Sequence, residues 1–182
     1  MSSTPKSSCV PIELNPTAAS LLGFLDMGPQ SGYELAAVIE TSIGNFWNIT
    51  RSQVYRELAL LEANGYVRLG KVGVRERKPY AVTALGRRAF NAWIAREPGE
   101  DITRSPLLLA LFFGHRIDKA TLSRFLRDHR ARHERKLAEY RERLPEVERR
   151  YPFPAYAMRF GLMREEMILA WFDSLAEEGL LH

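Results

Sequence analysis

The chain has 182 residues, 26 of them lysine or arginine and 22 aspartate or glutamate, and 46% are hydrophobic, which is enough to bury a core and excludes an intrinsically disordered chain. The single cysteine, Cys9, excludes a disulfide framework and a cysteine-based zinc cluster. The longest apolar run, residues 107–113, is far shorter than the ~20 residues that span a bilayer, and the first segment does not resemble a signal peptide, so we expect a cytoplasmic protein.

The first sixteen residues are rich in serine, threonine and proline without periodicity, so we expect residues 1–16 to form a flexible leader. Beyond it, apolar residues recur at helical spacing from Ala18 until Gly28, which predicts a first helix. Ser31 predicts the cap of a second short helix that ends near Glu40. Two short helices are therefore expected to open the folded part of the chain.

The third predicted helix carries the polar side chains of most interest. Thr50 and Gln53 have the spacing of a capping box, so the helix is expected to begin there and to end at Asn64–Gly65. Its apolar residues share one face, and the first turns of the opposite face carry Ser52, Gln53 and Arg56. Arginine can bond guanine and glutamine can bond adenine in the major groove, so this face is typical of a recognition helix.

Two β-prone segments follow, residues 66–72 and 77–83, and the four residues between them predict a hairpin. Thr83 predicts the cap of a fourth helix, which ends at a turn over residues 97–99. That turn is the predicted domain boundary. Three helices, a hairpin and a helix in this order predict a winged helix-turn-helix domain over residues 17–97, in a chain that is mainly α with one small β-hairpin.

Positive charge concentrates between Arg51 and Arg88. That segment holds nine basic and three acidic residues, a net charge of +6, whereas the rest of the chain has a net charge of −2. A basic helix beside a basic hairpin is the electrostatic footprint of a DNA-binding surface, and a solvated charged face is the alternative. The predicted DNA-binding residues are Tyr33, Thr50, Arg51, Ser52, Gln53, Tyr55, Arg56, Lys71, Arg75, Arg77, Lys78 and Tyr80.

The second half is predicted to be helical, with segments at 105–114, at 118–151 and from 154 to the end. The long segment resembles a coiled-coil seam, and Pro145 is expected to kink or end it near Leu144. The last segment is apolar on two sides, so a second chain is expected to cover one of them. Residues 98–182 are thus a predicted helical dimerisation domain, with interface residues Leu126, Tyr140, Phe160, Met163, Met167 and Trp171.

Three ordered motifs lie between Ala18 and Trp93. They are Gly32-Tyr33-Glu34-Leu35; Tyr55-Arg56-Glu57-Leu58 followed by Leu61-Glu62-Ala63-Asn64-Gly65-Tyr66-Val67; and Tyr80-Ala81-Val82-Thr83-Ala84-Leu85-Gly86-Arg87. Together they resemble the PadR family of transcriptional regulators. Beyond Pro98 the resemblance is one of architecture only, to family members with a helical C-terminal dimerisation domain. The resemblance implies a homodimer that represses a nearby promoter and is often released by a small aromatic or hydrophobic effector.

Several aromatic residues lie on helices expected to meet near a dimer axis. Most such residues belong to a core, because aromatic side chains dominate cores and interfaces alike. The alternative is an apolar effector pocket between these helices, suited to a flat aromatic compound. The residues predicted to line such a pocket are Trp93, Phe112, Phe113 and Trp171.

Other candidate chemistry is weak in this sequence. His129 and His133 have a spacing that can hold a metal, but no third ligand is evident, so neither a metal nor a cofactor is predicted. Ser105, His115 and Asp118 form no recognisable nucleophile and base grouping, so the chain is not expected to be an enzyme.

The leading hypothesis is a homodimeric winged-helix repressor whose two recognition helices enter successive major grooves of a near-palindromic operator. One alternative is an architectural DNA-binding protein that no ligand regulates. The other is an enzyme or ligand-binding module that acts on an anionic substrate. Sharp preference for an operator over bulk DNA would separate the first two.

Overall fold

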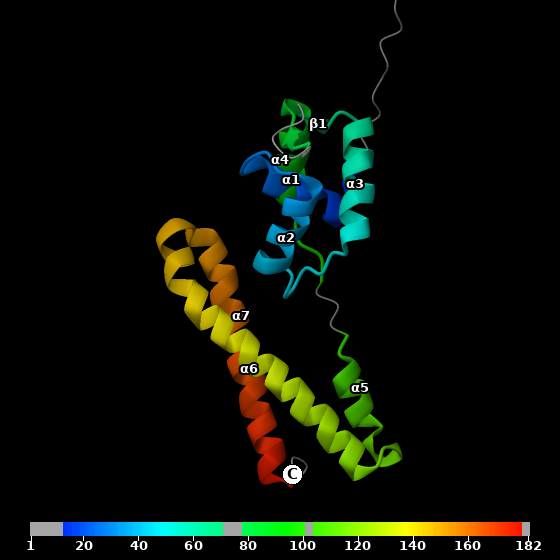
Figure 1. Ribbon diagram of the computed structural model, residues 1–182, viewed down its shortest axis with the longest axis vertical. Helices are drawn as coiled ribbons and strands as arrows, with labels where there is room; N and C mark the ends of the chain where they lie inside the picture. Colours follow the sequence, from blue (N-terminus) through cyan, green and yellow to red (C-terminus); the bar gives the residue numbers. More distant parts are fainter. Residues whose placement is uncertain (1–12, 71–77, 101–103, 180–182) are drawn as a thin grey trace, which may run out of the picture. The chain divides into compact units, whose positions relative to one another are not determined.

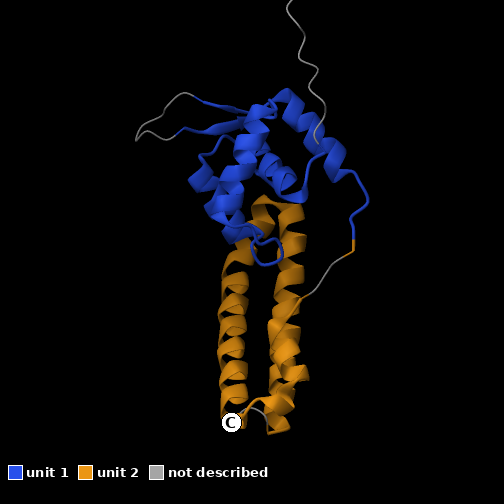
Figure 2. Cartoon of the chain, turned by 90° about the vertical axis from the view of Figure 1, so that its right-hand side faces the viewer, with its two compact units in different colours: residues 1–99 blue, residues 100–182 orange. Residues whose placement is uncertain are grey.

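The computed structural model describes residues 13–70, 78–100 and 104–179 (Figure 1). The chain divides into two compact units, unit 1 of residues 1–99 and unit 2 of residues 100–182 (Figure 2). The described residues are mainly helical and contain one two-stranded antiparallel sheet, which confirms the predicted fold class. Within these ranges, no helix combines the length and apolar character needed to cross a membrane.

Unit 1 contains four helices and the sheet. Each helix begins at a side chain that accepts a hydrogen bond from the first turn, as predicted for Ser31, Thr50 and Thr83. The strands are shorter than the predicted β-prone segments, and the predicted hairpin tip falls within residues 71–77, outside the described residues. The elements are α1 (Pro16–Asp26), α2 (Gly32–Ser42), α3 (Arg51–Ala63), β1 (Val67–Leu69), β2 (Tyr80–Val82) and α4 (Ala84–Ile94).

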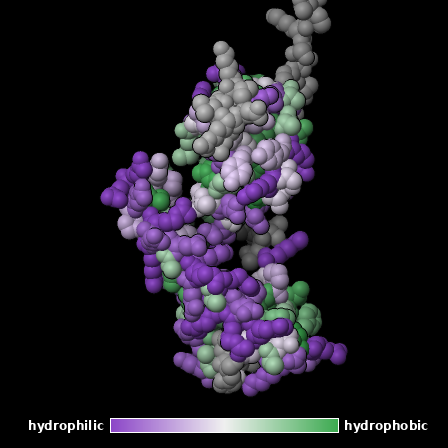
Figure 3. Space-filling view, viewed as in Figure 1, coloured by the Kyte–Doolittle hydropathy of each residue, from purple (hydrophilic) through white to green (hydrophobic). Residues whose placement is uncertain are grey.

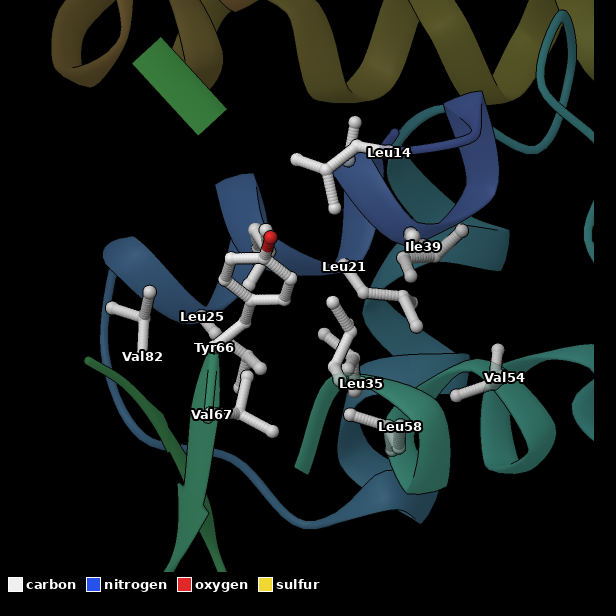
Figure 4. Packing of buried hydrophobic residues seen from close by; sticks show 14 of the residues in the cluster. Leu14, Leu21, Leu25, Leu35, Ile39, Val54, Leu58, Tyr66, Val67 and Val82 are labelled. Carbon is white, nitrogen blue, oxygen red and sulfur yellow. The ribbon is translucent and has the colours of Figure 1, made fainter. Parts of the chain in front are cut away.

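The core of unit 1 joins the first three helices to the sheet. Leu21, Leu35 and Leu58 are fully buried and come from α1, α2 and α3 respectively (Figure 4). Val67 and Val82 pair across the two strands and close one side of this core. Because one face of α3 is buried in the core, its opposite face has a fixed orientation relative to the rest of unit 1.

The described part of unit 1 begins at residue 13, earlier than the predicted leader of residues 1–16 implies. Leu14 is buried in the core, and the Asn15 side chain caps α1 by accepting a hydrogen bond from the Ala18 amide at 2.8 Å. Asparagine is among the strongest N-cap residues, so this start could have been predicted. Residues 1–12 of the predicted leader lie outside the described residues.

Unit 2 is built on two long helices that lie side by side (Figure 2). Leu126 and Phe172, one from each helix, are completely buried in its core. At another crossing a β-carbon on Gly161 would lie 2.5 Å from the Tyr140 hydroxyl, so glycine permits this close approach. The elements are α5 (Pro106–Phe112), the 3-10 helix η1 (Gly114–Arg116), α6 (Lys119–Arg150) and α7 (Pro152–Glu177).

The prediction that the long helix could end near Leu144 is wrong, because α6 runs through Pro145 to Arg150. A proline in a helix removes one backbone hydrogen bond. Here α6 packs along α7 on both sides of the proline: Arg141 lies 2.8 Å from Glu166, and Glu148 lies 2.7 Å from Arg159. The helix ends at Arg150, and Tyr151 caps it just before Pro152.

Candidate nucleic-acid interface

The first turns of α3 present the predicted polar face to solvent. Val54 and Leu58 point into the core of unit 1, whereas Arg51, Ser52 and Arg56 are exposed. The predicted assignment of inner and outer faces on this helix is therefore confirmed. A helix anchored on one side with exposed polar and cationic groups on the other has the geometry needed to enter a major groove.

The capping box at the start of α3 constrains one of the predicted base-contacting side chains. The Thr50 hydroxyl accepts from the Gln53 amide at 3.3 Å, and the Gln53 carboxamide oxygen accepts from the Thr50 amide at 2.8 Å. That oxygen also accepts from the Thr50 hydroxyl at 2.9 Å. Bidentate pairing with adenine needs both the oxygen and the NH₂ group of a glutamine. In this conformation Gln53 presents its NH₂ group as a donor, and bidentate pairing would require the cap to open.

Two tyrosines lie beside the N-terminus of α3. The Arg51 guanidinium sits 5.4 Å from the centre of the Tyr33 ring, a cation–π contact between α3 and α2. The Tyr55 ring packs so closely on Gly32 that a β-carbon there would lie 2.5 Å from it. Glycine at the start of α2 thus permits this position of the Tyr55 ring. Both phenols remain about half exposed, which allows their hydroxyls to meet phosphate oxygens.

Tyr80 occupies the edge of β2 and is half-buried. Its backbone forms a bridge with Gln30, with hydrogen bonds of 2.8 and 3.1 Å. Burial, followed by the nearby Glu62 carboxylate and the Tyr55 phenol, raises the pKa of Tyr80 above its ordinary value. The hydroxyl therefore stays protonated at neutral pH and can donate a hydrogen bond.

A buried carboxylate that the sequence analysis did not single out supports Arg56. Glu57 is almost fully buried, accepts from the Asn15 side chain at 2.9 Å and pairs with Arg56 at 3.2 Å. The exposed Arg56 is thus tied through Glu57 to the cap of α1. A glutamate on the apolar side of a helix was the sequence signal for this arrangement, because buried carboxylates need partners.

Replacing Asn15 with alanine is expected to lower the free energy of unfolding by about 1–2 kcal/mol, because it removes the cap of α1 and one partner of the buried Glu57. Urea denaturation followed by circular dichroism measures this change. Asn15→Asp keeps the cap but places a carboxylate against Glu57, so it should be destabilising as well. Wild-type stability in both variants would contradict the proposed network.

The basic residues between Arg51 and Arg88 differ in whether an acidic side chain pairs with them. Arg87 lies 2.6 Å from Asp26, which partly neutralises it. Lys78 is exposed just before β2. Three other predicted contacts, Lys71, Arg75 and Arg77, lie outside the described residues.

Of the six residues predicted for a dimer interface, Trp171 is partly buried against the core of unit 2, and the other five fall into two groups. Leu126 and Tyr140 are buried within the core of unit 2 itself, so Leu126 has no exposed surface to offer a second chain. Phe160, Met163 and Met167 are exposed on α7, each with about 65% of its surface accessible. These three residues therefore present exposed apolar side chains, as residues of a dimer interface must.

The residues predicted for an effector pocket lie in both units. Trp93 packs on the core of unit 1 and lines an apolar cavity of about 350 Å³ within that unit. Trp171 lines a cavity of about 590 Å³ within unit 2. Phe112 and Phe113 form an edge-to-face pair at 5.0 Å and are exposed. A hydrophobic patch lies over α5, which carries Phe112 (Figure 3).

His129 and His133 lie on α6, where both line the cavity of unit 2. The His133 Nδ1 atom contacts Glu165, which is completely buried on α7. In the part of the chain that the structure describes, no group of three histidine, cysteine, aspartate or glutamate side chains could hold a metal ion. Glu165 was not among the site residues predicted from the sequence, and its position on the inner face of α7 was the available signal.

Comparison with known proteins gives matches over both units. Residues 21–92 match the family described as Transcriptional regulator PadR-like family, and residues 103–178 match Virulence activator alpha C-term. A probable transcriptional regulator of Mycobacterium tuberculosis is 31% identical over 171 residues, which cover 81% of this chain and 88% of that protein. The negative transcriptional regulator PadR of Bacillus subtilis is 25% identical over 172 residues, covering 86% of this chain and 93% of that protein.

Solved structures show the same fold. The crystal structure of a PadR-like transcriptional regulator from Bacillus cereus has a TM-score of 0.80 at 23% identity and covers 89% of this chain and 96% of its own. That of Bacillus subtilis PadR in complex with operator DNA has a TM-score of 0.74, also at 23% identity with the same coverage. The same Bacillus subtilis protein in complex with p-coumaric acid has a TM-score of 0.65 at 22% identity, covering 89% and 96%.

Proposed function

The chain belongs to the PadR-like family of transcriptional regulators, and we propose that it is a homodimeric repressor that binds an operator through α3 and is released by a small hydrophobic or aromatic effector. Its family consists of regulators, which argues against an enzymatic activity. The observation that carries the proposal is the outer face of α3, whose exposed polar residues stand on a helix locked into the core of unit 1.

Recognition of bases is assigned to Arg56 and Gln53 on this face. Phosphate contacts are assigned to Tyr33, Tyr55 and Lys78, with Thr50, Arg51, Ser52, Lys71, Arg75, Arg77 and Tyr80 as further contacts. The net charge of +6 between Arg51 and Arg88 supplies the electrostatic attraction that DNA binding requires. The Bacillus subtilis relative was solved in complex with operator DNA, which supports the same role here.

Dimerisation is assigned to α7, whose outer face carries an apolar stripe. Five exposed residues recur at steps of three and four, the repeat with which helices pack as a coiled coil. Large apolar side chains in a contiguous exposed row mark an interaction surface. The stripe consists of Phe153, Tyr156, Phe160, Met163 and Met167.

Replacing Arg56 with alanine separates base recognition from general attraction to DNA. On a site mapped by footprinting near the gene for this chain, Arg56→Ala is expected to cost about 1–3 kcal/mol, with a smaller loss on a scrambled duplex. Lys78→Ala is the matched control, because it removes one positive charge and should weaken binding to both duplexes alike. Equal losses for both variants on both duplexes would refute these roles, and wild-type binding without sequence preference would favour an architectural protein.

A further inference from the structure

Unit 2 contains a cavity of its own, with a volume of about 590 Å³ between the start of α5 and the facing sides of α6 and α7. Its walls are mainly apolar and include Leu107, Leu108, Ile168 and Trp171. Pockets that bind organic ligands have this size range and combine apolar walls with a few polar groups. The cavity therefore has the dimensions of a small-molecule site.

Two polar residues that line this cavity, His133 and Arg164, contact the same buried carboxylate. Glu165 is completely buried, contacts His133 and forms an ion pair of 3.0 Å with an Nη atom of Arg164. This arrangement fixes the Arg164 guanidinium beside the cavity that it lines. A guanidinium held by one carboxylate keeps further N–H groups with which to bind a second acceptor.

One of those N–H groups lacks an acceptor. The Arg164 Nε atom is buried and has no hydrogen-bond partner among the residues that the structure describes. Buried donors are almost always paired, because leaving one unpaired costs free energy. This atom is closed off from solvent, so a ligand oxygen in the cavity would meet the Nη–H groups of Arg164 instead, whose side chain is 31% exposed and lines the cavity.

We infer that this cavity binds an amphipathic organic anion, with its apolar body between α5 and α7 and its carboxylate on Arg164. The inference rests on the proposed function, since it gives the effector a site and a chemical class. His129 also lines the cavity and can add one neutral hydrogen-bonding group. Burial, together with the nearby Arg132 and His133, lowers the pKa of His129 below its ordinary value, so this histidine is neutral at pH 7.

The position of the cavity also provides a route from ligand to operator. Met167 lines the cavity and belongs to the exposed stripe of α7. A ligand that moves Met167 therefore changes the surface assigned to the second chain. An effector releases DNA only by binding one arrangement of the dimer more tightly than another, and this shared residue gives it the means.

Calorimetric titration of the full chain with 2-naphthoic acid and with 2-naphthalenemethanol tests the anion site. The two probes share a ring system and differ in charge, so the acid is expected to bind about tenfold or more tightly than the alcohol. Arg164→Met should remove this preference by weakening the acid alone. Arg159→Met is the matched control, because Arg159 lies on the same helix, pairs with Glu148 and does not line the cavity.

A second pair of variants tests the cavity without touching its charges. Leu108→Trp places a large ring at the wall and should abolish binding of both probes, whereas Leu109→Trp lies next to it on α5, outside the lining, and should bind both normally. Equal affinity for acid and alcohol in the wild type, or unchanged binding in Leu108→Trp, would overturn the inference. If Arg164→Met fails to fold, the wild-type comparison and the tryptophan pair decide.

Operator affinity measured on the same preparations keeps the two ideas distinguishable. If the protein binds its operator but does not prefer the acid, the proposed DNA-binding function stands and the anion site is refuted. If the protein binds the acid through Arg164 but prefers no DNA sequence, the anion site stands and the repressor function is refuted.

Discussion

Replacing Gly86 with alanine is expected to lower the free energy of unfolding of unit 1 by about 3 kcal/mol and to abolish operator binding at the growth temperature of a mesophile. A β-carbon at this position would lie 2.2 Å from the Tyr66 carbonyl oxygen and 2.9 Å from a methyl group of Val82. The first of these contacts is with backbone, so no side-chain rotation relieves it. The start of α4 would have to move away from the sheet.

That movement would break a set of hydrogen bonds at one junction. The Thr83 hydroxyl caps α4 by accepting from the Gly86 amide at 3.1 Å and donates to the Gly65 carbonyl at 2.7 Å. The Thr83 amide donates to the Tyr66 carbonyl at 2.9 Å. The motif that runs from Tyr80 to Arg87 thus has a structural role. It joins β2 and the start of α4 to the residues that follow α3.

Thermal unfolding followed by circular dichroism measures the effect of Gly86→Ala. The matched control is Gly99→Ala, because among the described residues no atom beyond its chain neighbours lies within 4 Å of the β-carbon that it would add. We expect Gly99→Ala to leave both stability and operator binding at the wild-type level. An alanine at position 86 with wild-type stability would mean that the junction adjusts more easily than the contacts indicate.

Local signals made most of unit 1 predictable from the sequence. Capping residues such as Ser31 and Thr50 fix helix starts through hydrogen bonds with residues three positions away, so they can be recognised without tertiary information. Gly65 adopts a φ of +73°, which few other residues tolerate, and it marks the end of α3 as predicted. The exposed face of α3 follows from helical periodicity alone.

What the sequence did not predict depends on contacts between distant residues. The Asn15–Glu57 bond joins residues 42 positions apart, and the His133–Glu165 contact joins residues 32 positions apart. Neither spacing belongs to a local motif. Continuation of α6 through Pro145 is likewise accompanied by contacts between distant residues, since α7 packs along α6 and pairs with it on both sides of the proline. Pairing between elements, rather than local propensity, decided each of these features.

Replacing Met163 with aspartate is expected to convert the dimer to a monomer. Met163 lies in the middle of the exposed stripe of α7, so a carboxylate there would be buried without a partner in the proposed interface. A loss of about 3 kcal/mol raises the dimer dissociation constant more than about hundredfold. Sedimentation velocity at micromolar concentration measures this shift. Ala138→Asp, an equal change of charge at an exposed site on α6, is the control and should leave the dimer intact.

Operator binding should fall in the Met163→Asp variant although unit 1 is unchanged. A dimer binds two half-sites with one chain tethering the other, so the second contact benefits from a high effective concentration that a monomer lacks. The expected loss of operator affinity is therefore about hundredfold or more, while the helical circular dichroism signal and the unfolding of unit 1 stay at wild-type values. A monomeric wild type, or a Met163→Asp dimer with full operator affinity, would show that another surface joins the two chains.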